Sequence, residues 1–513
     1  MRQSLATVTR LLLLAGLFLS LDGWAHDEYR NGPTFRHSLT TEKKPRAVKK
    51  LNKAQPVQFR AGVACIDMTP TVFPIQLRSG KSNYVHDPLH VRAVAFQRGE
   101  GRAVICLIDA IGIGRDMSDL AKTRAAEKTG WKPEEMLICA THTHTAPKGG
   151  EGTPGKEAYE KLKHEKLKEA IVQAIQSLQP ARVGFGSDEE PSEVRNRRWF
   201  LKEGTMPPNP LGEQDQVKTN AGRNDLIKPA GPTDPEICVI DVRTTRNKPL
   251  ALIANYALHY VGGIPKVKEE DGRLVGMASA DYFGEFSRIM PYRIGGSNPP
   301  EDFVALMTNG ASGDINNLVF TGTRAPRSPF EQVRIVASKA ADTAWRAVKK
   351  IENYDDKPIV AVLQREVDLP YRKPAKREII LAESLLKKSS KERNEINKRT
   401  TSVANRVIEY SGPEHPETEP VLIQAVRIGE QAIVSMPFEV LVEIGLEIKK
   451  KSPIERTFLI SMANGGYGYL PPPNQHKLGG YETWLGTSRF QPQSSDLLIK
   501  QLLEMLEDLK KLK

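Results

Sequence analysis

Short apolar runs alternate along the chain with segments whose apolar residues recur at helical spacing. The runs are rich in β-branched residues and predict buried strands at His90–Arg98, Ala103–Asp109, Met136–Ala140, Ile237–Val242, Val304–Thr308 and Thr457–Ser461. The spacing predicts helices at Met117–Lys128, Lys156–Leu178 and Phe330–Lys350. This alternation favours an α/β fold of layered mixed sheets flanked by helices, in a single large domain.

Three segments rich in glycine and proline interrupt the alternation, at 186–235, 263–277 and 291–301. Loops this long in a compact domain are more often binding loops than simple connections. We therefore expect them to border a functional site.

Residues 1–25 differ from everything that follows. Arg2 and Arg10 precede the eleven-residue apolar run Leu11–Leu21, and small residues follow it at 23–25. A membrane-spanning helix needs about 20 apolar residues, so this segment predicts a cleaved signal peptide and an exported protein, periplasmic or extracellular. We expect a basic flexible linker at 26–58 and the α/β domain at 59–513, with a charged helical insertion at about 373–410.

The 513 residues include 74 Lys and Arg against 62 Asp and Glu, a formal net charge of +12. Much of the excess falls in Lys43–Lys53 and in Lys373–Arg399, where basic residues alternate with Glu. We find none of the aromatic or structural motifs of nucleic-acid readers, so we expect no nucleic-acid partner. The basic stretches are either solvated or make weak peripheral contact with an anionic membrane surface. Nothing in the sequence implies a partner protein.

The four cysteines each lie inside an apolar, strand-like run. They are Cys65, Cys106, Cys139 and Cys238. This placement predicts free, buried thiols in the core, because disulfide frameworks belong to short, cysteine-dense chains.

The pattern Thr-His-Thr-His-Thr at 141–145 follows the apolar strand at 136–140 directly. In extended backbone, residues two apart point to the same side, so we expect His142 and His144 to leave the strand end together. Histidine is the commonest metal ligand. Two such residues alone fit a metal site or a pair of ordinary hydrogen-bonded histidines.

Further donor residues stand where other apolar runs end. His259 follows one such run, Glu439 lies at a strand-to-helix junction after Pro437, and Tyr467 and Tyr469 follow another. These are the positions at which α/β folds bind ligands, and a catalytic zinc site takes about three such donors and keeps one open position. Each donor also has a structural explanation, such as a helix N-terminus for Glu439.

The segment THTHTAPKGG resembles the THTHSGP segment of the neutral/alkaline, non-lysosomal ceramidase family. Four further segments are similar to that family's motifs and follow in the same order, so the likeness extends over residues 60–510. They are NYALHYVGG, NGASGDINN, MPFEV, and NGGYGYLPPP together with GGYETW.

The resemblance implies a role for each matching residue. The family's zinc ligands fall on His142, His259, Glu439 and Tyr469. His144 falls on a substrate-contacting or proton-handling position. Arg197 resembles the family's substrate-side arginine, and Tyr481 in GGYETW is placed with it at the substrate.

The chain departs from the family in two places. The family's active-site serine position holds Asn316 here, and an amide has no ionisable nucleophilic hydroxyl. Ceramidases of this family continue into an immunoglobulin-like domain, whereas this chain ends in the amphipathic segment Ser494–Lys513.

The resemblance implies an exported zinc-dependent hydrolase of amide bonds, with a lipid or small N-acyl compound as substrate. A zinc-activated water would attack, His144 would move the proton to the departing amine, and Arg197 and Asn316 would orient the substrate. Two alternatives stay open. One is a non-catalytic exported protein that keeps the metal pocket and binds a lipid or glycan, and the other is a hydrolase of a different N-acyl substrate.

Overall fold

The core of the molecule is an eight-stranded mixed sheet. The computed structural model describes residues 57–513, so the predicted signal peptide and almost all of the predicted linker lie outside the described residues. The strand order is β16-β13-β12-β7-β1-β4-β5-β6, and only the pairs β13–β16 and β5–β6 are parallel. The strands are β1 Arg60–Asp67, β4 His90–Arg98, β5 Gly101–Ile108, β6 Met136–Ala140, β7 Gln179–Glu189, β12 Glu236–Thr244, β13 Pro249–Tyr256 and β16 Val304–Asn309.

A second, four-stranded sheet packs face to face on the first. Its order is β18-β19-β20-β22, with strands Val360–Pro370, Thr418–Ile428, Gln431–Ser435 and Arg456–Ile460. Phe96 and Leu107 of the large sheet and Val426 and Phe458 of the small one belong to one buried cluster between them. Interdigitated side chains between two sheets form a core about 10 Å thick.

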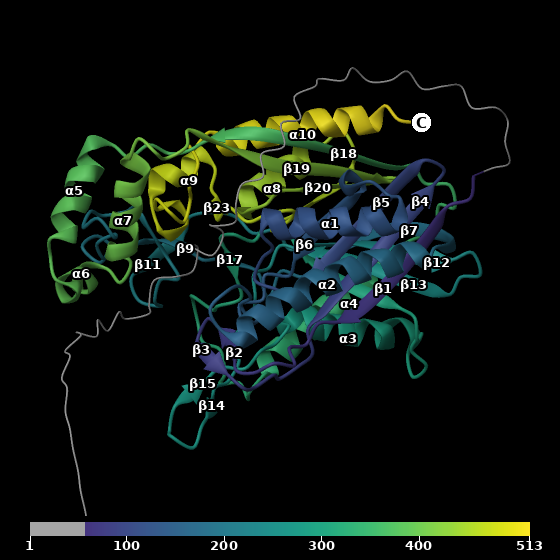
Figure 1. Cartoon of the computed structure of the whole chain (residues 1–513), viewed down its shortest axis with the longest axis horizontal. Coiled ribbons are helices and arrows are strands. Elements are labelled where there is room, and N and C mark those ends of the chain that lie inside the picture. The colour runs from purple at the N-terminus through teal and green to yellow at the C-terminus, as the bar shows by residue number, and fades with distance from the viewer. Residues whose placement is uncertain (1–56) are drawn as a thin grey trace, which may run out of the picture.

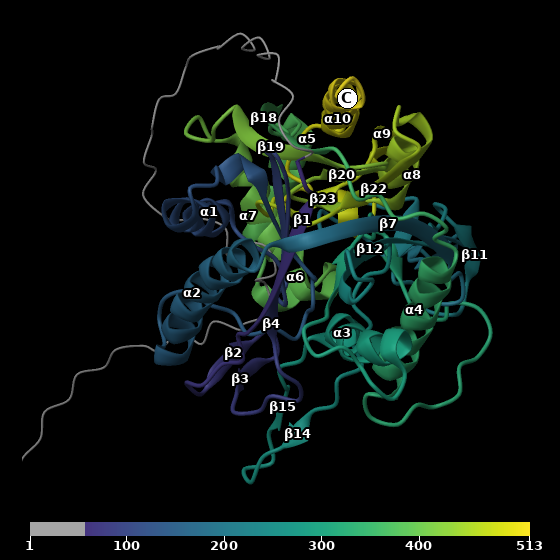
Figure 2. The same ribbon diagram turned by 90° about the vertical axis from the view of Figure 1, so that its right-hand side faces the viewer.

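Helices cover the outer faces of both sheets and complete four layers. Two pairs cover the large sheet, α1 Arg115–Thr129 with α2 Pro154–Gln176, and α3 Asp281–Gly295 with α4 Glu331–Lys349. Figure 2 separates these pairs, with α1 and α2 on the left and α3 and α4 on the right. Helices α8 Val442–Lys451 and α10 Ser494–Lys510 cover the small sheet, and Figure 1 shows α10 along the top.

This layering explains the apolar runs in the sequence. Strand β4 is buried at six consecutive residues, because helices cover one face and the second sheet covers the other. The α/β fold class is confirmed, as are the six predicted strands and three predicted helices, whose ends differ from the prediction by at most three residues. Among the described residues, no helix is both long enough and apolar enough to cross a membrane.

The charged segment predicted as a helical insertion lies between β18 and β19 and contains three helices. They are α5 Lys376–Leu386, α6 Ser390–Ile396 and α7 Thr400–Ser411. The break before α6 is set by Ser389, whose side chain accepts a hydrogen bond from the backbone of Glu392. Figure 1 shows these helices at one end of the molecule. Strands β9 Arg198–Leu201 and β11 Leu226–Pro229 belong to a separate small sheet of three strands.

The remaining elements are short and lie around the edges of the sheets. Strands are β2 Ile75–Leu77, β3 Gly80–Ser82, β8 Arg195–Asn196, β10 Val217–Thr219, β14 Val267–Lys268, β15 Leu274–Val275, β17 Ile315–Asn316, β21 Glu439–Val440 and β23 Tyr469–Leu470. Helical elements are α9 Pro473–Leu478 and the 3₁₀ turns η2 Pro133–Glu135 and η3 Tyr481–Thr483.

Two expectations about local structure were wrong. The segment 291–301 begins inside α3, which continues through Pro291 to Gly295, where the Gly296 N–H still closes a helical hydrogen bond to the Tyr292 carbonyl. Cys65 is exposed, since burial on its side of β1 falls from Ala61 through Val63 to Cys65 and Asp67, whereas the other three cysteines are free and buried as expected.

The buried ion pair between Arg92 and Asp109 gives a stability test. The atoms Arg92 Nη1 and Asp109 Oδ2 are 2.9 Å apart and both side chains are almost fully buried. We expect Arg92→Leu to lower the free energy of unfolding by about 3–5 kcal/mol, because it leaves the Asp109 carboxylate buried without a counter-charge. Urea denaturation measures the loss, and Arg92→Leu/Asp109→Leu should recover part of it.

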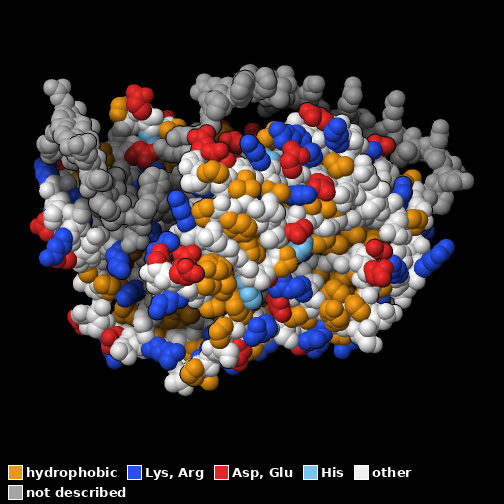
Figure 3. All heavy atoms as spheres, turned by 60° about the horizontal axis from the view of Figure 1, so that its bottom comes forward, with side chains coloured by type: hydrophobic (Ala, Val, Ile, Leu, Met, Phe, Trp, Pro, Cys, Tyr) orange, Lys and Arg blue, Asp and Glu red, His pale blue; other side chains and the backbone are white. Residues whose placement is uncertain are grey.

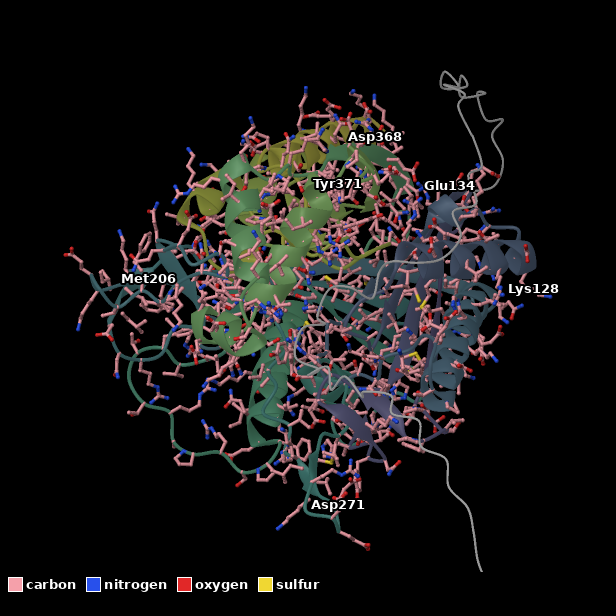
Figure 4. All side chains as sticks on the ribbon, turned by 60° about the vertical axis from the view of Figure 1, so that its left-hand side comes forward. Lys128, Glu134, Met206, Asp271, Asp368 and Tyr371 are labelled. Carbon is pink, nitrogen blue, oxygen red and sulfur yellow. The ribbon has the colours of Figure 1, made fainter. Side chains whose placement is uncertain are left out.

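An exposed ion pair serves as the matched control. Arg273 pairs with Asp271, which Figure 4 shows at the tip of the projecting β14–β15 hairpin. Arg273→Ala should leave the urea midpoint unchanged, because an exposed pair contributes little. If Arg92→Leu is no more harmful than this variant, the buried pair does not stabilise the fold.

Candidate metal centre

The first histidine of the site stands just beyond the end of β6. The backbone N–H groups of Thr141 and His142 donate to Ile108 and Ala110, so pairing with the β5 side continues past the strand. His142 has φ 68°, in the left-handed region, so the extended backbone expected across Thr141–Thr145 was wrong. The two imidazoles still converge, with His142 Nε2 and His144 Nε2 3.0 Å apart. Such a strained residue is typical of functional sites.

Two further donors approach the same point. His259 Nε2 lies 3.1 Å from His142 Nε2, and Glu439 Oε2 lies 3.3 Å from His142 Nε2 and 3.7 Å from His259 Nε2. A tetrahedral metal site with bonds of about 2.1 Å separates its donor atoms by about 3.4 Å. The donor atoms of His142, His259 and Glu439 therefore stand near the spacing that a bound ion requires. With His144 added, the three histidines form a cluster that could hold a metal ion.

Backbone carbonyls fix the tautomers of two histidines. His142 Nδ1 lies 2.5 Å from the carbonyl oxygen of Ile111, and His259 Nδ1 lies 3.0 Å from that of Ser312. A carbonyl oxygen can only accept, so both Nδ1 atoms carry hydrogen and both Nε2 atoms present lone pairs to the centre. Fixed tautomers of this kind are the usual support of metal-binding histidines.

His144 is held in the opposite tautomer. Arg78 Nη1 lies 3.0 Å from His144 Nδ1, and a guanidinium can only donate. In the neutral ring the hydrogen must then be on Nε2, the atom that faces His142. The ring also stacks on Tyr260, with centroids 3.8 Å apart. His142 and His259 thus present acceptor nitrogens suited to a metal ion, and His144 presents a hydrogen-bond donor beside them.

Burial keeps the imidazoles of His259 and His144 neutral. Burial lowers the pKa of His259 well below its ordinary value, and the neighbouring His142 and Arg197 act in the same direction. Burial likewise lowers the pKa of His144, aided by His142, His259, Arg78 and Arg197. A neutral imidazole is the form that binds metal.

A short parallel ladder places Glu439 beside Tyr469. Strands β21 and β23 pair in parallel with Glu439 opposite Tyr469. The Tyr469 hydroxyl accepts a hydrogen bond of 3.0 Å from Arg197 Nη2. Burial, with the Glu439 charge beside it, raises the pKa of Tyr469 well above its ordinary value, while Arg197 opposes this shift. Tyr467 instead packs with Phe438 and Phe490 in the outer core and takes no part in the site.

Arg197 is itself fixed by a buried carboxylate. Its Nε donates to Glu482 Oε1 at 2.9 Å, and Arg198 Nη1 donates to Glu482 Oε2 at 2.7 Å. Glu482 and Arg198 are fully buried. Glu482 thus accepts one charge-assisted hydrogen bond from each arginine, and the bond from Arg197 holds its guanidinium in one orientation toward Tyr469.

The loop 309–314 joins the ligands to one another. The Ser312 carbonyl accepts from His259, and Asp314 Oδ1 accepts from the backbone N–H of Val442, at the start of α8. Gly313 packs against the backbone of Glu439, where a Cβ would lie 2.7 Å from the carbonyl oxygen. The sequence matches this segment to a family motif with an asparagine in place of the serine, but predicts no supporting role for it. Its two glycines and buried aspartate were the available signal for a supporting loop.

Comparison with known proteins identifies the fold that carries this site. No protein-family model and no curated protein sequence matches the chain. Among solved structures, a neutral ceramidase from Pseudomonas aeruginosa is similar, with a TM-score of 0.63 and 17% identity over 89% of this chain and 75% of that one. The chain has the neutral ceramidase fold. A ceramidase complexed with C2 is similar to the same degree, with 16% identity over 89% of this chain and 76% of that one.

The two remaining predicted residues lie in different surroundings within the neutral ceramidase fold. The ring of Tyr481 contacts that of Tyr469, with centroids 5.5 Å apart, so Tyr481 borders the centre. Asn316 Nδ2 donates to Asn220 Oδ1 at 2.6 Å, and its Oδ1 accepts from the Leu318 backbone. In the described part of the chain, these hydrogen bonds tie Asn316 to the 220 loop and not to the histidines.

Substitution of His259 tests the candidate metal centre. The purified protein should bind about one divalent metal ion per chain, and His259→Ala should lose it, because the site depends on its ligand count. Elemental analysis after dialysis measures the content. His164→Ala is the control, because His164 lies on α2 beside Glu160 and does not belong to the three-histidine cluster. Equal metal content in both variants would show that His259 is not a ligand.

Proposed function

We propose that the chain is an exported, zinc-dependent hydrolase of amide bonds in N-acyl compounds. The observation that carries this proposal is the pair of Nε2 lone pairs and the Glu439 carboxylate at ligand spacing, with the N–H of His144 beside them. The neutral ceramidase fold supports the hydrolase class. Export rests on the sequence of residues 1–25 alone.

Zinc fits the donors better than other common ions. The set consists of two imidazole nitrogens, a carboxylate from Glu439 and a phenol from Tyr469, which stands opposite Glu439 in the β21–β23 pair. Calcium and magnesium prefer oxygen donors only, whereas zinc takes nitrogen and oxygen together in a tetrahedral site. Zinc held there would supply a Lewis acid that polarises a carbonyl and lowers the pKa of a water molecule to about 7.

The side chains around the centre divide the remaining work. His144 directs its Nε2–H toward the centre and is suited to donate a hydrogen bond to the oxygen of a reacting carbonyl. This is a different role from the proton transfer expected from the sequence, because Arg78 occupies the second ring nitrogen. Arg197, held by Glu482, orients the phenol of Tyr469 and with it the substrate side of the pocket.

Hydrolysis of a panel of N-acyl amides tests the reaction. The zinc-loaded protein should release fatty acid from at least one N-acyl compound, and a chelator should abolish the release until zinc is restored. His142→Ala should be inactive with and without added zinc, because it removes a ligand. Turnover that survives the chelator, or a zinc-loaded protein that cleaves no member of the panel, would overturn the proposal.

Two substitutions of His144 separate its two roles. We expect His144→Ala to lower kcat by about 100- to 1000-fold, the usual effect of losing one donor to a developing oxyanion. His144→Gln keeps an N–H group and should recover part of the loss if the residue acts as a donor. Equal losses in the two variants would instead indicate proton transfer, which a glutamine cannot perform.

A further inference from the structure

The candidate metal centre is bordered by two arginines, Arg78 and Arg399, that have no acidic partner among residues 57–513. We infer that the preferred substrate carries an anionic group on the amine side of its scissile amide, and that Arg78 and Arg399 bind this group. This inference rests on the proposed amide hydrolysis and names its substrate class as N-acyl amino acids and similar N-acyl acids.

Arg78 comes from the turn between β2 and β3. Within residues 57–513, its side chain has one hydrogen bond, to His144, and no carboxylate partner. A guanidinium has five N–H donors. One donor therefore fixes His144 while the others are available to a ligand at the same place.

Arg399 comes from the other side of the site, at the start of α7. Its Cζ lies 4.7 Å from the ring centroid of Tyr481, and Tyr481 contacts Tyr469. Two other arginines of the insertion have acidic partners, since Arg377 pairs with Glu213 and Arg406 with Glu409, and Arg393 donates to the carbonyls of Leu386 and Lys388. Arg399 has no carboxylate partner in the described part of the chain, although it is half-buried.

The charges of the site do not cancel. Arg197 and Arg198 share the single carboxylate of Glu482, and Glu439 and Asp314 are the other acids at the centre. With Arg78 and Arg399 this makes four cations against three anions, a surplus of +1 before any metal ion is added. Burial raises the pKa of the Tyr481 phenol, and the charges of Arg399, Arg197 and Arg78 oppose this shift while Glu439 adds to it.

A surplus of this kind selects for charge on the substrate. On the face shown in Figure 3, basic and acidic side chains are interspersed, which gives no field of one sign there. A site bordered by arginines without carboxylate partners among the described residues instead attracts anions, and the planar guanidinium matches a carboxylate in two hydrogen bonds. A neutral N-acyl lipid would leave both arginines without a partner.

The reaction is then the hydrolysis of an N-acyl amino acid. Water adds its oxygen to the acyl carbon, the C–N bond breaks, and the nitrogen leaves with both protons of the water. The products are a fatty acid carboxylate and a zwitterionic amino acid, so the net charge of −1 is conserved. No oxidant or second substrate is needed.

A pair of substrates that differ only in charge tests the inference. N-dodecanoylglycine should be hydrolysed with a higher kcat/KM than N-dodecanoylglycinamide. We expect Arg399→Gln to lower the ratio of these two values by about 10- to 100-fold, mainly through KM, because a hydrogen bond to a charged group contributes about 1.5–3 kcal/mol. Arg377→Gln, in the same insertion, should leave the ratio unchanged. Equal values for both substrates, or an unchanged ratio in Arg399→Gln, would overturn the inference while the proposed function stands.

A binding measurement separates the inference from the proposed function. The ketone 4-oxopentadecanoic acid replaces the amide nitrogen of N-dodecanoylglycine by carbon, so it cannot be hydrolysed at that bond. By calorimetry on the zinc-loaded protein, the acid should bind more tightly than its carboxamide, and Arg399→Gln should remove the difference. This result without any amide hydrolysis would support anion recognition and refute the proposed function.

The anionic group could also be a lipid headgroup. Sedimentation with phosphatidylglycerol vesicles distinguishes this source. If Arg399→Gln weakens vesicle binding but leaves the preference between the two ketones unchanged, the arginine recognises a membrane surface and the inference about the substrate is wrong.

Discussion

The close approach of Gly313 to Glu439 is the constraint on which the metal centre depends. The N–H of Gly313 donates to the Val440 carbonyl at 2.7 Å, and the glycine has no side chain because the Glu439 backbone occupies that space. The same loop offers the Ser312 carbonyl to His259 and the Asp314 carboxylate to α8. Any larger residue at 313 would separate the two segments and move a carboxylate away from the imidazoles. One contact without a side chain therefore holds ligands from distant parts of the chain in register.

The layers around this contact allow the site to be both buried and specific. The eight-stranded sheet delivers His142 and His259 beyond the ends of β6 and β13, while Glu439 and Tyr469 come from short strands of the C-terminal half. Burial removes water from the imidazoles, and the Ile111 and Ser312 carbonyls then decide which ring nitrogen faces the centre. In water these tautomers would exchange freely. The fold thus converts an ordinary pair of histidines into directed donors.

The sequence predicts the strands and the main helices because both faces of the large sheet are buried, which leaves continuous apolar runs such as His90–Arg98. It also predicts that His142, His144 and His259 come together, since each stands where an apolar run ends, and the structure places the three in one cluster. It does not predict Glu482 or Arg78, whose roles depend on contacts with residues distant in the chain. The sequence predicts an extended backbone at His142, and this prediction is wrong. The left-handed conformation of His142 is set by contacts with residues 108–111, which the local sequence does not reveal.

The insertion α5–α7 has a consequence for how this fold diversifies. It joins two neighbouring antiparallel strands, β18 and β19, and such a connection can be lengthened or replaced at small entropic cost. Its residue Arg399 contacts Tyr481 beside the candidate site, whereas the histidines and Glu439 belong to other segments. Selection can therefore exchange this insertion and change the border of the site without disturbing the histidine cluster. The same independence makes the insertion a natural unit for grafting in enzyme engineering.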